Sequence, residues 1–298
     1  MIKLLSFLGR ICTCLKARLV SAQKAIFSAL GRIYTCLILL FLYVPIFVLI
    51  TFSFNRTRSR SVWSGFTLDW YRSLLTDSSI MDAFYTTLVL ALLASLIATV
   101  AGTFAAVGFY GMRKRWRTPL MQINNIPMIN ADIITGVSLC LLFVFLGGLF
   151  RFSLGFATLL IAHVTFCIPY VVLSVMPKLR QLDSNLIDAA QDLGCTWMKA
   201  FRKVIIPEIM PGIINGMIIS FTLSIDDFVI SYFTAGGGVM TLPMKIFAMT
   251  RRRVSPEINA LSTILFLSVL FLLIIINVRQ MRQDDRQKKR RAVSSGRH

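Results

Sequence analysis

Six long apolar stretches constrain the fold of this chain more than any other feature of its sequence. A helix that crosses ~30 Å of hydrocarbon needs about 20 mostly apolar residues, and 56% of the 298 residues are hydrophobic while 15% are charged. The sequence therefore predicts an all-α, polytopic membrane protein with six transmembrane helices between residues 33 and 278, and it argues against a soluble enzyme. The expected spans cover approximately residues 33–54, 83–110, 119–148, 154–176, 211–233 and 258–278.

Three of these stretches have compositions that predict further structural features. The second is rich in Ala and Gly, which favours close helix contacts inside a bundle. The third is polar over its first part and contains Pro127, so we expect one long helix interrupted near Pro127, with the break against protein or a polar cavity. The fourth contains Pro169, which predicts a kink.

The basic residues predict the orientation of the chain. There are 32 Lys and Arg against 13 Asp and Glu, a formal net charge of +19. Bases in short loops favour the cytoplasmic side, and with both termini on that side 23 of the 32 bases lie in cytoplasmic segments. We therefore expect a multi-pass membrane protein with both termini on the cytoplasmic side. Arg251, Arg252 and Arg253 would lie outside, against the trend, and nothing in the sequence explains them.

Two basic segments flank the spans. Residues 1–32 interleave bases with apolar residues and contain no acid, which predicts an amphipathic helix on the cytoplasmic membrane surface. A signal peptide is the alternative, but a continuous apolar core and a small-residue cleavage site are lacking. Residues 279–298 form a basic tail, and we expect membrane lipid as the partner of both segments. Nucleic acid is not an expected partner, because the sequence has no soluble domain with a basic face.

Residue patterns typical of several enzyme and metal sites are missing from the sequence. The six cysteines form no C-x-x-C pair, and the two histidines, His163 and His298, are far apart. The glycine run at 236–238 is not followed by Gly-Lys-Ser/Thr, so it is not a phosphate loop. We therefore expect no catalytic residue, no metal site and no cofactor in this chain. We expect His163, alone on an apolar helix, to be a structural histidine rather than a proton relay.

The long segment 178–210, between the fourth and fifth spans, predicts two short helices that could dock on a cytoplasmic partner. Gly194 would end the first, and Thr196 would cap the second, which would end before Pro207. The segment resembles the E-A-A-x3-G-x9-I-x-L-P motif of ABC importer permeases, with conservative departures at three positions. The residues that match in spacing are Asp188, Ala189, Ala190, Gly194, Val204, Ile206 and Pro207.

Further segments narrow the resemblance to the spermidine/putrescine permease family, over roughly residues 33–278. They are Ser-Phe-Asn at 53–55, Phe-Thr-Leu-Asp-Trp-Tyr at 66–71, His-Val-Thr-Phe-Cys at 163–167, Ser-Phe-Thr-Leu-Ser-Ile-Asp-Asp at 220–227 and Ser-Pro-Glu-Ile-Asn-Ala-Leu at 255–261. The resemblance implies a type I ABC importer permease fold. It also implies that segment 178–210 is the coupling loop that contacts the ATPase.

The same resemblance implies an assembly. Its other members would be a homologous sister permease, two copies of an ABC ATPase that bind ATP and Mg, and an external polyamine-binding protein. Transport would proceed by alternating access, with the coupling loops passing the nucleotide-driven movement of the ATPases to the membrane helices. A different small or cationic solute is the alternative cargo, and an ion-gradient-driven carrier is the alternative class; such a carrier does not need a coupling loop.

Carboxylates within the spans suggest where a cationic solute would pass. An Asp at a helix centre costs ~2.5–3.5 kcal/mol on insertion scales, so it usually faces a cavity or a partner. On one continuous helix Ser220, Ser224, Asp227 and Ser231 would form a polar stripe, which we expect to line the path. Asp226 would point elsewhere, along the path or toward a neighbouring helix. Asp132 either lines the path or caps a helix.

Overall fold

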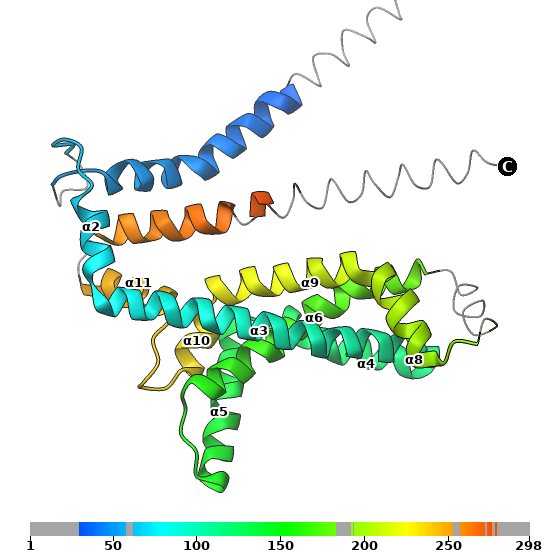
Figure 1. Ribbon diagram of the computed structural model, residues 1–298. Coiled ribbons are helices and arrows are strands. Elements are labelled where there is room, and N and C mark those ends of the chain that lie inside the picture. The colour runs from blue at the N-terminus through cyan, green and yellow to red at the C-terminus, as the bar shows by residue number, and fades with distance from the viewer. Residues whose placement is uncertain are drawn as a thin grey trace, which may run out of the picture. The chain divides into compact units, whose positions relative to one another are not determined.

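The computed structural model describes residues 30–57, 62–182, 192, 194–252, 257–271, 273–275 and 278 (Figure 1). Within these residues the regular elements are helices, apart from an isolated antiparallel bridge between Asn55 and Phe66. Six helices are long and apolar enough to cross a membrane, which confirms the all-α class and the number of spans. They are Leu30–Ser53, Ser78–Gly111, Asp132–Phe150, Phe156–Arg180, Met198–Asp226 and Glu257–Ile275. The basic tail and most of the basic amino-terminal segment lie outside the described residues.

The chain divides into two compact units, residues 1–67 and 68–298. In the first unit, the helix Leu30–Ser53 corresponds to the expected first span. Asn55 follows it and closes a loop, because its side-chain amide donates to the carbonyl of Val62 at 2.8 Å and its Oδ1 accepts from the amide of Ser64 at 3.0 Å. The rings of Phe54 and Phe66 stack with centroids 5.2 Å apart.

The core of the second unit is a bundle of three long helices, α3 (Ser78–Gly111), α6 (Phe156–Arg180) and α9 (Ile206–Asp226) (Figure 1). Small residues let their backbones approach closely, as expected for the second span. A Cβ on Gly102 of α3 would lie 2.7 Å from Cβ of Val171, and a Cβ on Gly216 of α9 would lie 3.0 Å from Cα of the same valine. Val171 of α6 is therefore the point where all three helices meet.

The start of α3 is fixed by its own sequence. Asp77 lies just before the helix, and its carboxylate accepts hydrogen bonds from the amides of Ser79 and Ile80 at 2.9 and 3.4 Å. This is the side-chain cap that satisfies amides left free at a helix start. A short helix, α2 (Asp69–Thr76), precedes it. The span thus begins five residues before the apolar stretch, because an N-cap rather than hydropathy decides where the helix begins.

The third predicted span divides close to the predicted place. α4 (Lys114–Ile129) contains both Pro119 and Pro127, and the break lies at Asn130 and Ala131, before α5 (Asp132–Phe150). An interruption near Pro127 is therefore present, about one turn beyond the proline itself. Pro127 lies within α4, whereas Asn130 and Ala131 both take extended backbone conformations with ψ of 147° and 138°. α6, in contrast, remains one helix through Pro169 and Pro177.

The fifth span begins earlier and ends earlier than predicted. α8 (Trp197–Ala200), the π-helical turn η1 (Phe201–Ile205) and α9 follow one another without interruption, so the helix does not end before Pro207. In the π turn the amide of Ile206 bonds to the carbonyl of Phe201, five residues back, and this wider register accommodates the proline that follows. At its far end the helix stops at Asp226, and a separate short helix, α10 (Val229–Thr234), follows.

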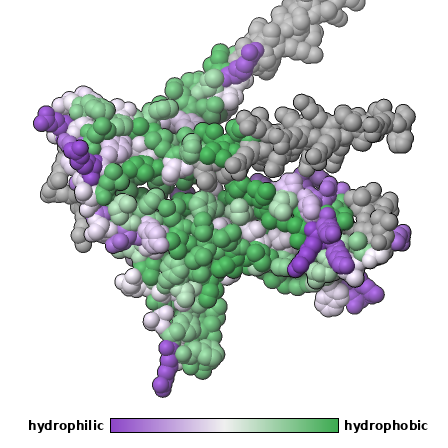
Figure 2. Space-filling model, in the orientation of Figure 1, coloured by the Kyte–Doolittle hydropathy of each residue, from purple (hydrophilic) through white to green (hydrophobic). Residues whose placement is uncertain are grey.

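Apolar side chains cover the surface of the long helices. Figure 2 shows hydrophobic residues along the bundle and hydrophilic residues mainly near its ends. Among the exposed residues are Leu96, Phe104 and Phe145, at 46%, 64% and 73% of their full accessibility. Such a surface suits lipid or another helix of a complex rather than water. α11 (Leu242–Arg252) and the helix Glu257–Ile275 complete the unit.

Candidate functional site

The break between α9 and α10 is made by Asp227. Its backbone, with φ of −66° and ψ of 120°, leaves the helix. Its carboxylate then accepts hydrogen bonds from the amides of Ile230 at 3.3 Å and Ser231 at 2.8 Å, and from the hydroxyl of Ser231 at 2.9 Å. An Asp side chain that bonds nearby amides competes with the continuing helix, so this residue ends one helix and caps the next.

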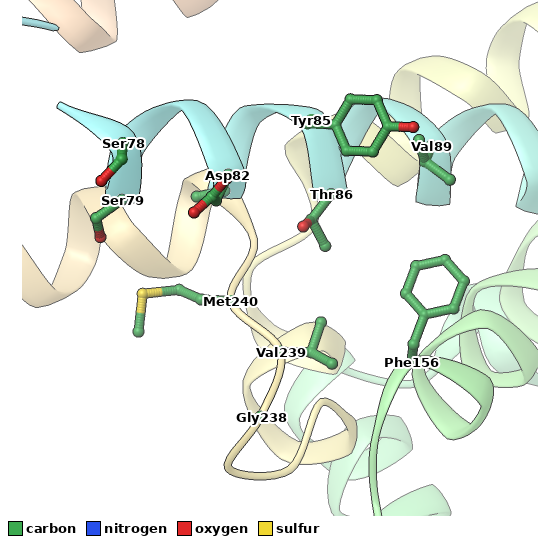
Figure 3. A pocket seen from close by; sticks show the side chains of 11 residues that line it. Ser78, Ser79, Asp82, Tyr85, Thr86, Val89, Phe156, Gly238, Val239 and Met240 are labelled. Carbon is green, nitrogen blue, oxygen red and sulfur yellow. The ribbon is translucent and has the colours of Figure 1, made fainter. Parts of the chain in front are cut away.

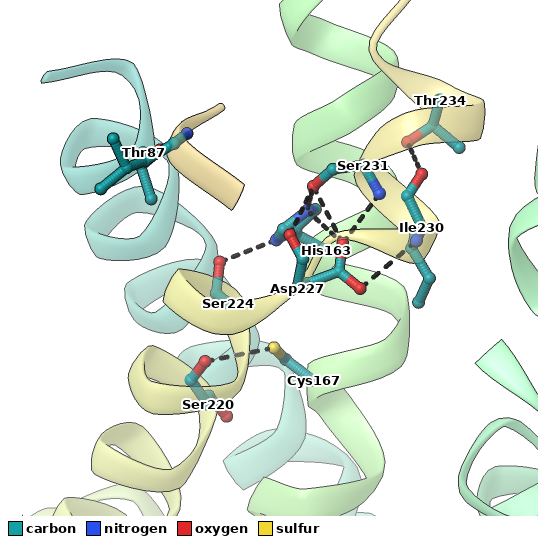
Figure 4. A network of polar contacts seen from close by, with 10 residues as sticks. Thr87, His163, Cys167, Ser220, Ser224, Asp227, Ile230, Ser231 and Thr234 are labelled. Carbon is teal, nitrogen blue, oxygen red and sulfur yellow. Dashed lines mark hydrogen bonds and ion pairs between the residues drawn. The ribbon is translucent and has the colours of Figure 1, made fainter. Parts of the chain in front are cut away.

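His163 of α6 lies against this break and bridges its two sides (Figure 4). The imidazole is fully buried. Its Nδ1 lies 2.7 Å from the hydroxyl of Ser224 in α9, and its Nε2 lies 3.0 Å from the hydroxyl of Ser231 in α10. The same Nε2 is 3.5 Å from Oδ2 of Asp227. His163 is thus a satisfied, buried histidine, as expected, and we call these four residues the break network.

The donors and acceptors of the break network fit one arrangement. The hydroxyl of Ser231 donates to Asp227, so its oxygen is free to accept a hydrogen bond from Nε2–H of His163. Nδ1 then accepts from the hydroxyl of Ser224. Every polar atom of the imidazole is paired, which is the condition for burying such a group without a large penalty.

A second polar contact joins α6 and α9 one turn away from His163. The thiol of Cys167 donates to the carbonyl of Ser220 at 3.5 Å (Figure 4). The hydroxyl of Ser220 is buried and has no hydrogen-bond partner among the described residues. Unlike His163, Cys167 makes its hydrogen bond to one side of the break, although it also belongs to a buried cluster with Ile230 of α10.

The prediction that Ser220, Ser224, Asp227 and Ser231 form a polar stripe on one continuous helix is wrong. The helix ends at Asp226, and the first three of these side chains are directed into the packing between helices: Ser220 and Ser224 are 0% and 1% exposed, and the Asp227 side chain is 9% exposed. The prediction failed because it extended helical geometry through a residue whose side chain terminates the helix.

The other two acids of the predicted site, Asp132 and Asp226, are exposed. Asp132 is the first residue of α5, after Ala131 at the N-cap position, and it makes no capping hydrogen bond in the described part of the chain. A carboxylate there still interacts favourably with the positive end of the helix dipole. Asp226 is the last residue of α9, directly before the break. The structure therefore separates five candidates into two exposed carboxylates and three buried residues.

Aromatic side chains around the break are engaged in packing. The ring of Phe228 lies 4.4 Å from that of Phe247 in α11, and Tyr232 lies 5.6 Å from both Phe228 and Phe233. The guanidinium of Arg251 is 4.9 Å from the centroid of the Phe247 ring. One member of the unexplained arginine triplet thus makes a cation–π contact.

The coupling end of the fifth span is anchored in the core. Gly194 has a φ of 77°, the left-handed conformation of a glycine that ends a helix, and α8 begins directly after Thr196. Phe201 and Ile205 of the π turn are each 6% exposed and pack with Val175 and Leu179 of α6. Val204, Ile206 and Pro207 of the motif lie in this continuous helix. Asp188, Ala189 and Ala190 lie outside the described residues.

A pocket of about 510 Å³ opens near the start of α3 (Figure 3). Asp82 and Tyr85 of α3, Phe156 of α6 and Val239 of the segment after α10 line it. The ammonium of Lys245 donates to Ser79 in its wall at 2.5 Å. With a carboxylate and an ammonium close together, the pocket has no clear charge preference. Among the described residues no group of three or more His, Cys, Asp or Glu could hold a metal ion.

The sequence placed Ser224, Asp227 and Ser231 in one polar stripe but did not join His163 to them, and it did not predict a second connection between α6 and α10. The hydroxyl of Thr158 in α6 donates to the carbonyl of Thr234 at the end of α10 at 2.9 Å. The one signal for the network was a histidine and an acid in two separate apolar spans. Such groups are costly in a membrane unless they are paired, and this cost could have suggested that they meet.

Comparisons with known proteins agree with this architecture. The family described as binding-protein-dependent transport system inner membrane component matches residues 98–289. The spermidine/putrescine transport system permease protein PotC of Escherichia coli (strain K12) is 39% identical over 244 residues, covering 82% of this chain and 90% of that protein. The putrescine transport system permease protein PotI of the same strain is 42% identical over 228 residues, 76% of this chain and 81% of that protein.

Solved structures support the fold. A bacterial ABC transporter involved in the import of the acidic polysaccharide alginate has a chain that matches with a TM-score of 0.67 at 15% identity, over 89% of this chain and 99% of that one. The MetNI methionine ABC transporter matches with a TM-score of 0.56 at 19% identity, over 72% and 98%. The expected type I importer permease fold is confirmed. By the family match and its relatives, the chain belongs to the inner membrane components of binding-protein-dependent transport systems, the permeases of ABC importers.

Proposed function

We propose that this chain is one of two permease subunits of an ATP-driven importer of polyamines such as spermidine and putrescine. The observation that carries the proposal is its 39% identity over 244 residues to a spermidine/putrescine permease and 42% over 228 residues to a putrescine permease. The chain also has six helices that are long and apolar enough to cross a membrane. The chain forms half of the translocation path, and the sister permease forms the other half.

The exposed carboxylates Asp132 and Asp226 are the residues we assign to that path. A polyamine carries several ammonium groups, and a carboxylate inside a membrane replaces part of the water that such a group loses. Both acids lie next to breaks in their helices, where the backbone also offers unpaired polar groups. Ser220, Ser224 and Asp227 support the path from within the helix packing and do not contact the substrate.

The segment around Gly194 is the coupling loop in this proposal. Its helix continues into the fifth span and packs on α6 through Phe201 and Ile205, so movement of the loop is transmitted to the bundle. Two copies of an ABC ATPase, which bind ATP and Mg, contact it through Asp188, Ala189 and Ala190. An external polyamine-binding protein delivers the substrate. This chain itself has no catalytic residue and no cofactor.

The protein lies in the bacterial inner membrane with both termini in the cytoplasm. The distribution of Lys and Arg supports this orientation. Residues 1–32 and 279–298, which are strongly basic, lie along the inner surface near anionic lipid. The orientation places the coupling loop on the side where ATP is present, as the mechanism requires.

The test is to co-purify the chain with its ATPase and sister permease, reconstitute the complex with its binding protein, and measure uptake and ATP hydrolysis. Spermidine or putrescine should stimulate both. Stimulation by another cation but not by a polyamine would contradict the substrate assignment. Uptake driven by an ion gradient, by the chain purified without an ATPase, would contradict the ATP-driven class.

A further inference from the structure

A single helix, the fifth span, connects the coupling end of the protein to the break network. It runs from Met198 to Asp226, 29 residues, which is about 43 Å at the usual rise of an α-helix. At the coupling end its apolar side chains Phe201 and Ile205 are buried in the core. At the other end it stops at Asp227. Because the helix is continuous from Met198 to Asp226, a displacement of the coupling loop is carried along it to the break.

Beyond the break, α10 packs against α5. Ile230 and Phe233 of α10 lie so close to Gly136 of α5 that a Cβ there would be 3.4 Å from Cα of Ile230 and 3.0 Å from Cδ2 of Phe233. Asp132 lies one turn before Gly136 at the start of α5. The orientation of α10 relative to α9 therefore sets the position of α5, and with it the positions of the two exposed carboxylates relative to each other.

His163 of α6 makes hydrogen bonds to both sides of this break through one side chain. It bonds Ser224 in α9 and Ser231 in α10 with opposite edges of its ring, at 2.7 and 3.0 Å. Its Nε2 also has a second acceptor close by, Oδ2 of Asp227 at 3.5 Å. A change of about 0.5 Å would exchange the two acceptors, a small movement compared with those of helices in conformational transitions.

We propose that His163 is a positioning residue that sets the angle between α9 and α10, so that movement of the coupling loop is transferred to α10 and α5. The inference rests on the proposed transport function and adds the coupling step within it. Its bonds to Ser231 and Asp227 exchange as the helices move, and its bond to Ser224 keeps the imidazole on α9. Loss of the imidazole leaves α9 free to move without α10. Binding-protein-stimulated ATP hydrolysis then continues while transport fails.

The test compares His163→Ala, His163→Gln and Cys167→Ala in the reconstituted complex, with the number of polyamines transported per ATP hydrolysed as the readout. Cys167→Ala is the matched control, because Cys167 lies one turn along α6 and its hydrogen bond among the described residues is to α9. His163→Ala should lower the ratio about tenfold or more, as expected for the loss of an interaction between charged or polar groups. His163→Gln, which keeps a donor, should recover part of it, and Cys167→Ala should stay close to the wild type.

A ratio for His163→Ala equal to that of Cys167→Ala would overturn the positioning role. If His163→Ala does not assemble, Ser231→Ala gives the same test, since it removes the link to α10 and leaves the bond between His163 and Ser224. An unchanged ratio in Ser231→Ala would also overturn the role. A wild-type complex in which polyamines stimulate neither uptake nor ATP hydrolysis would instead overturn the proposed function on which the role rests.

Discussion

Two regions of the contact between α6 and the fifth span are built from different chemistry. Near Val171, Gly102 of α3 and Gly216 of α9 bring three backbones into close contact. Near His163, the contact consists of directional hydrogen bonds between an imidazole, two hydroxyls and a carboxylate. We call these regions the glycine contact and the break network.

The difference shows which part of the bundle is suited to remain fixed and which to rearrange. Close backbone packing depends on many weak contacts that are lost together if the helices separate. A hydrogen-bond network can exchange one partner for another over a short distance and stay satisfied. The glycine contact therefore holds the three-helix core together, and the break network is the place where α10 and α5 can change orientation.

The largest expected effect comes from filling the glycine contact. Gly102→Leu should prevent assembly of the complex or lower its melting temperature strongly, because the new side chain would collide with Val171; overpacking typically costs about 1–3 kcal/mol and occasionally more. Gly108→Leu in the same helix is the control, since nothing lies within 4 Å of a Cβ there. Equal amounts of assembled complex for both variants would contradict the close packing at Val171.

The next effect distinguishes two adjacent acids. Asp227→Ala removes the acceptor of two amides and one hydroxyl and should destabilise the complex by about 1–3 kcal/mol, the typical cost of unsatisfied buried groups. Asp226→Ala, at an exposed position, should leave the melting temperature nearly unchanged and lower polyamine uptake. Thermal stability and uptake are measured for both. A reversed pattern would show that the buried and exposed roles have been assigned to the wrong residues.

A smaller effect is expected at the second connection between α6 and α10. Thr158→Val removes the hydrogen bond to the carbonyl of Thr234 and the bonds of the same hydroxyl to the backbone of Gly155, and it should cost about 1–2 kcal/mol, since one hydrogen bond contributes about 0.5–1.5 kcal/mol net. The matched control is Thr165→Val, because that hydroxyl bonds within its own helix and is exposed. Melting temperatures of the two variants provide the comparison. A larger loss for Thr165→Val would contradict the role of the Thr158 contact.

The smallest effect is expected for Ser220→Ala. The hydroxyl of Ser220 is buried without a partner in the described part of the chain, so its removal should be neutral or slightly stabilising. Ser224→Ala, one turn further along α9, should be destabilising because it leaves Nδ1 of His163 unpaired. Uptake is measured together with stability. Lost uptake in a stable Ser220→Ala complex would show that this hydroxyl contacts the substrate after all.

The sequence was sufficient to predict the six spans but not the positions at which they are interrupted. Apolar stretches of the necessary length predicted six helices, because membrane thickness sets a minimum length that few other structures need. The break positions depended on individual side chains instead. The interruption expected near Pro127 lies about one turn beyond it, while Asp227 was not expected to break a helix and does.

The sequence predicted which types of residue form the candidate site, but it did not predict how they are arranged. The cost of a carboxylate in a membrane correctly marked Asp227 as a residue that needs partners. Its partner His163 is 64 residues earlier in the chain, and no local pattern could join them. The coupling segment was recognisable from the spacing of Gly194 and Pro207, because the residues of this motif lie close together in the chain. The continuous helix through Pro207 depends on a π turn, which spacing alone does not reveal.

The most direct test of a fixed glycine contact beside a rearranging break network is hydrogen–deuterium exchange of the reconstituted complex, with and without trapped nucleotide. The amides of α10 should lose protection when nucleotide is bound, while those of residues 212–220 in α9 stay protected in both states. Equal protection of α10 in the two states, or greater loss in residues 212–220 than in α10, would contradict the account.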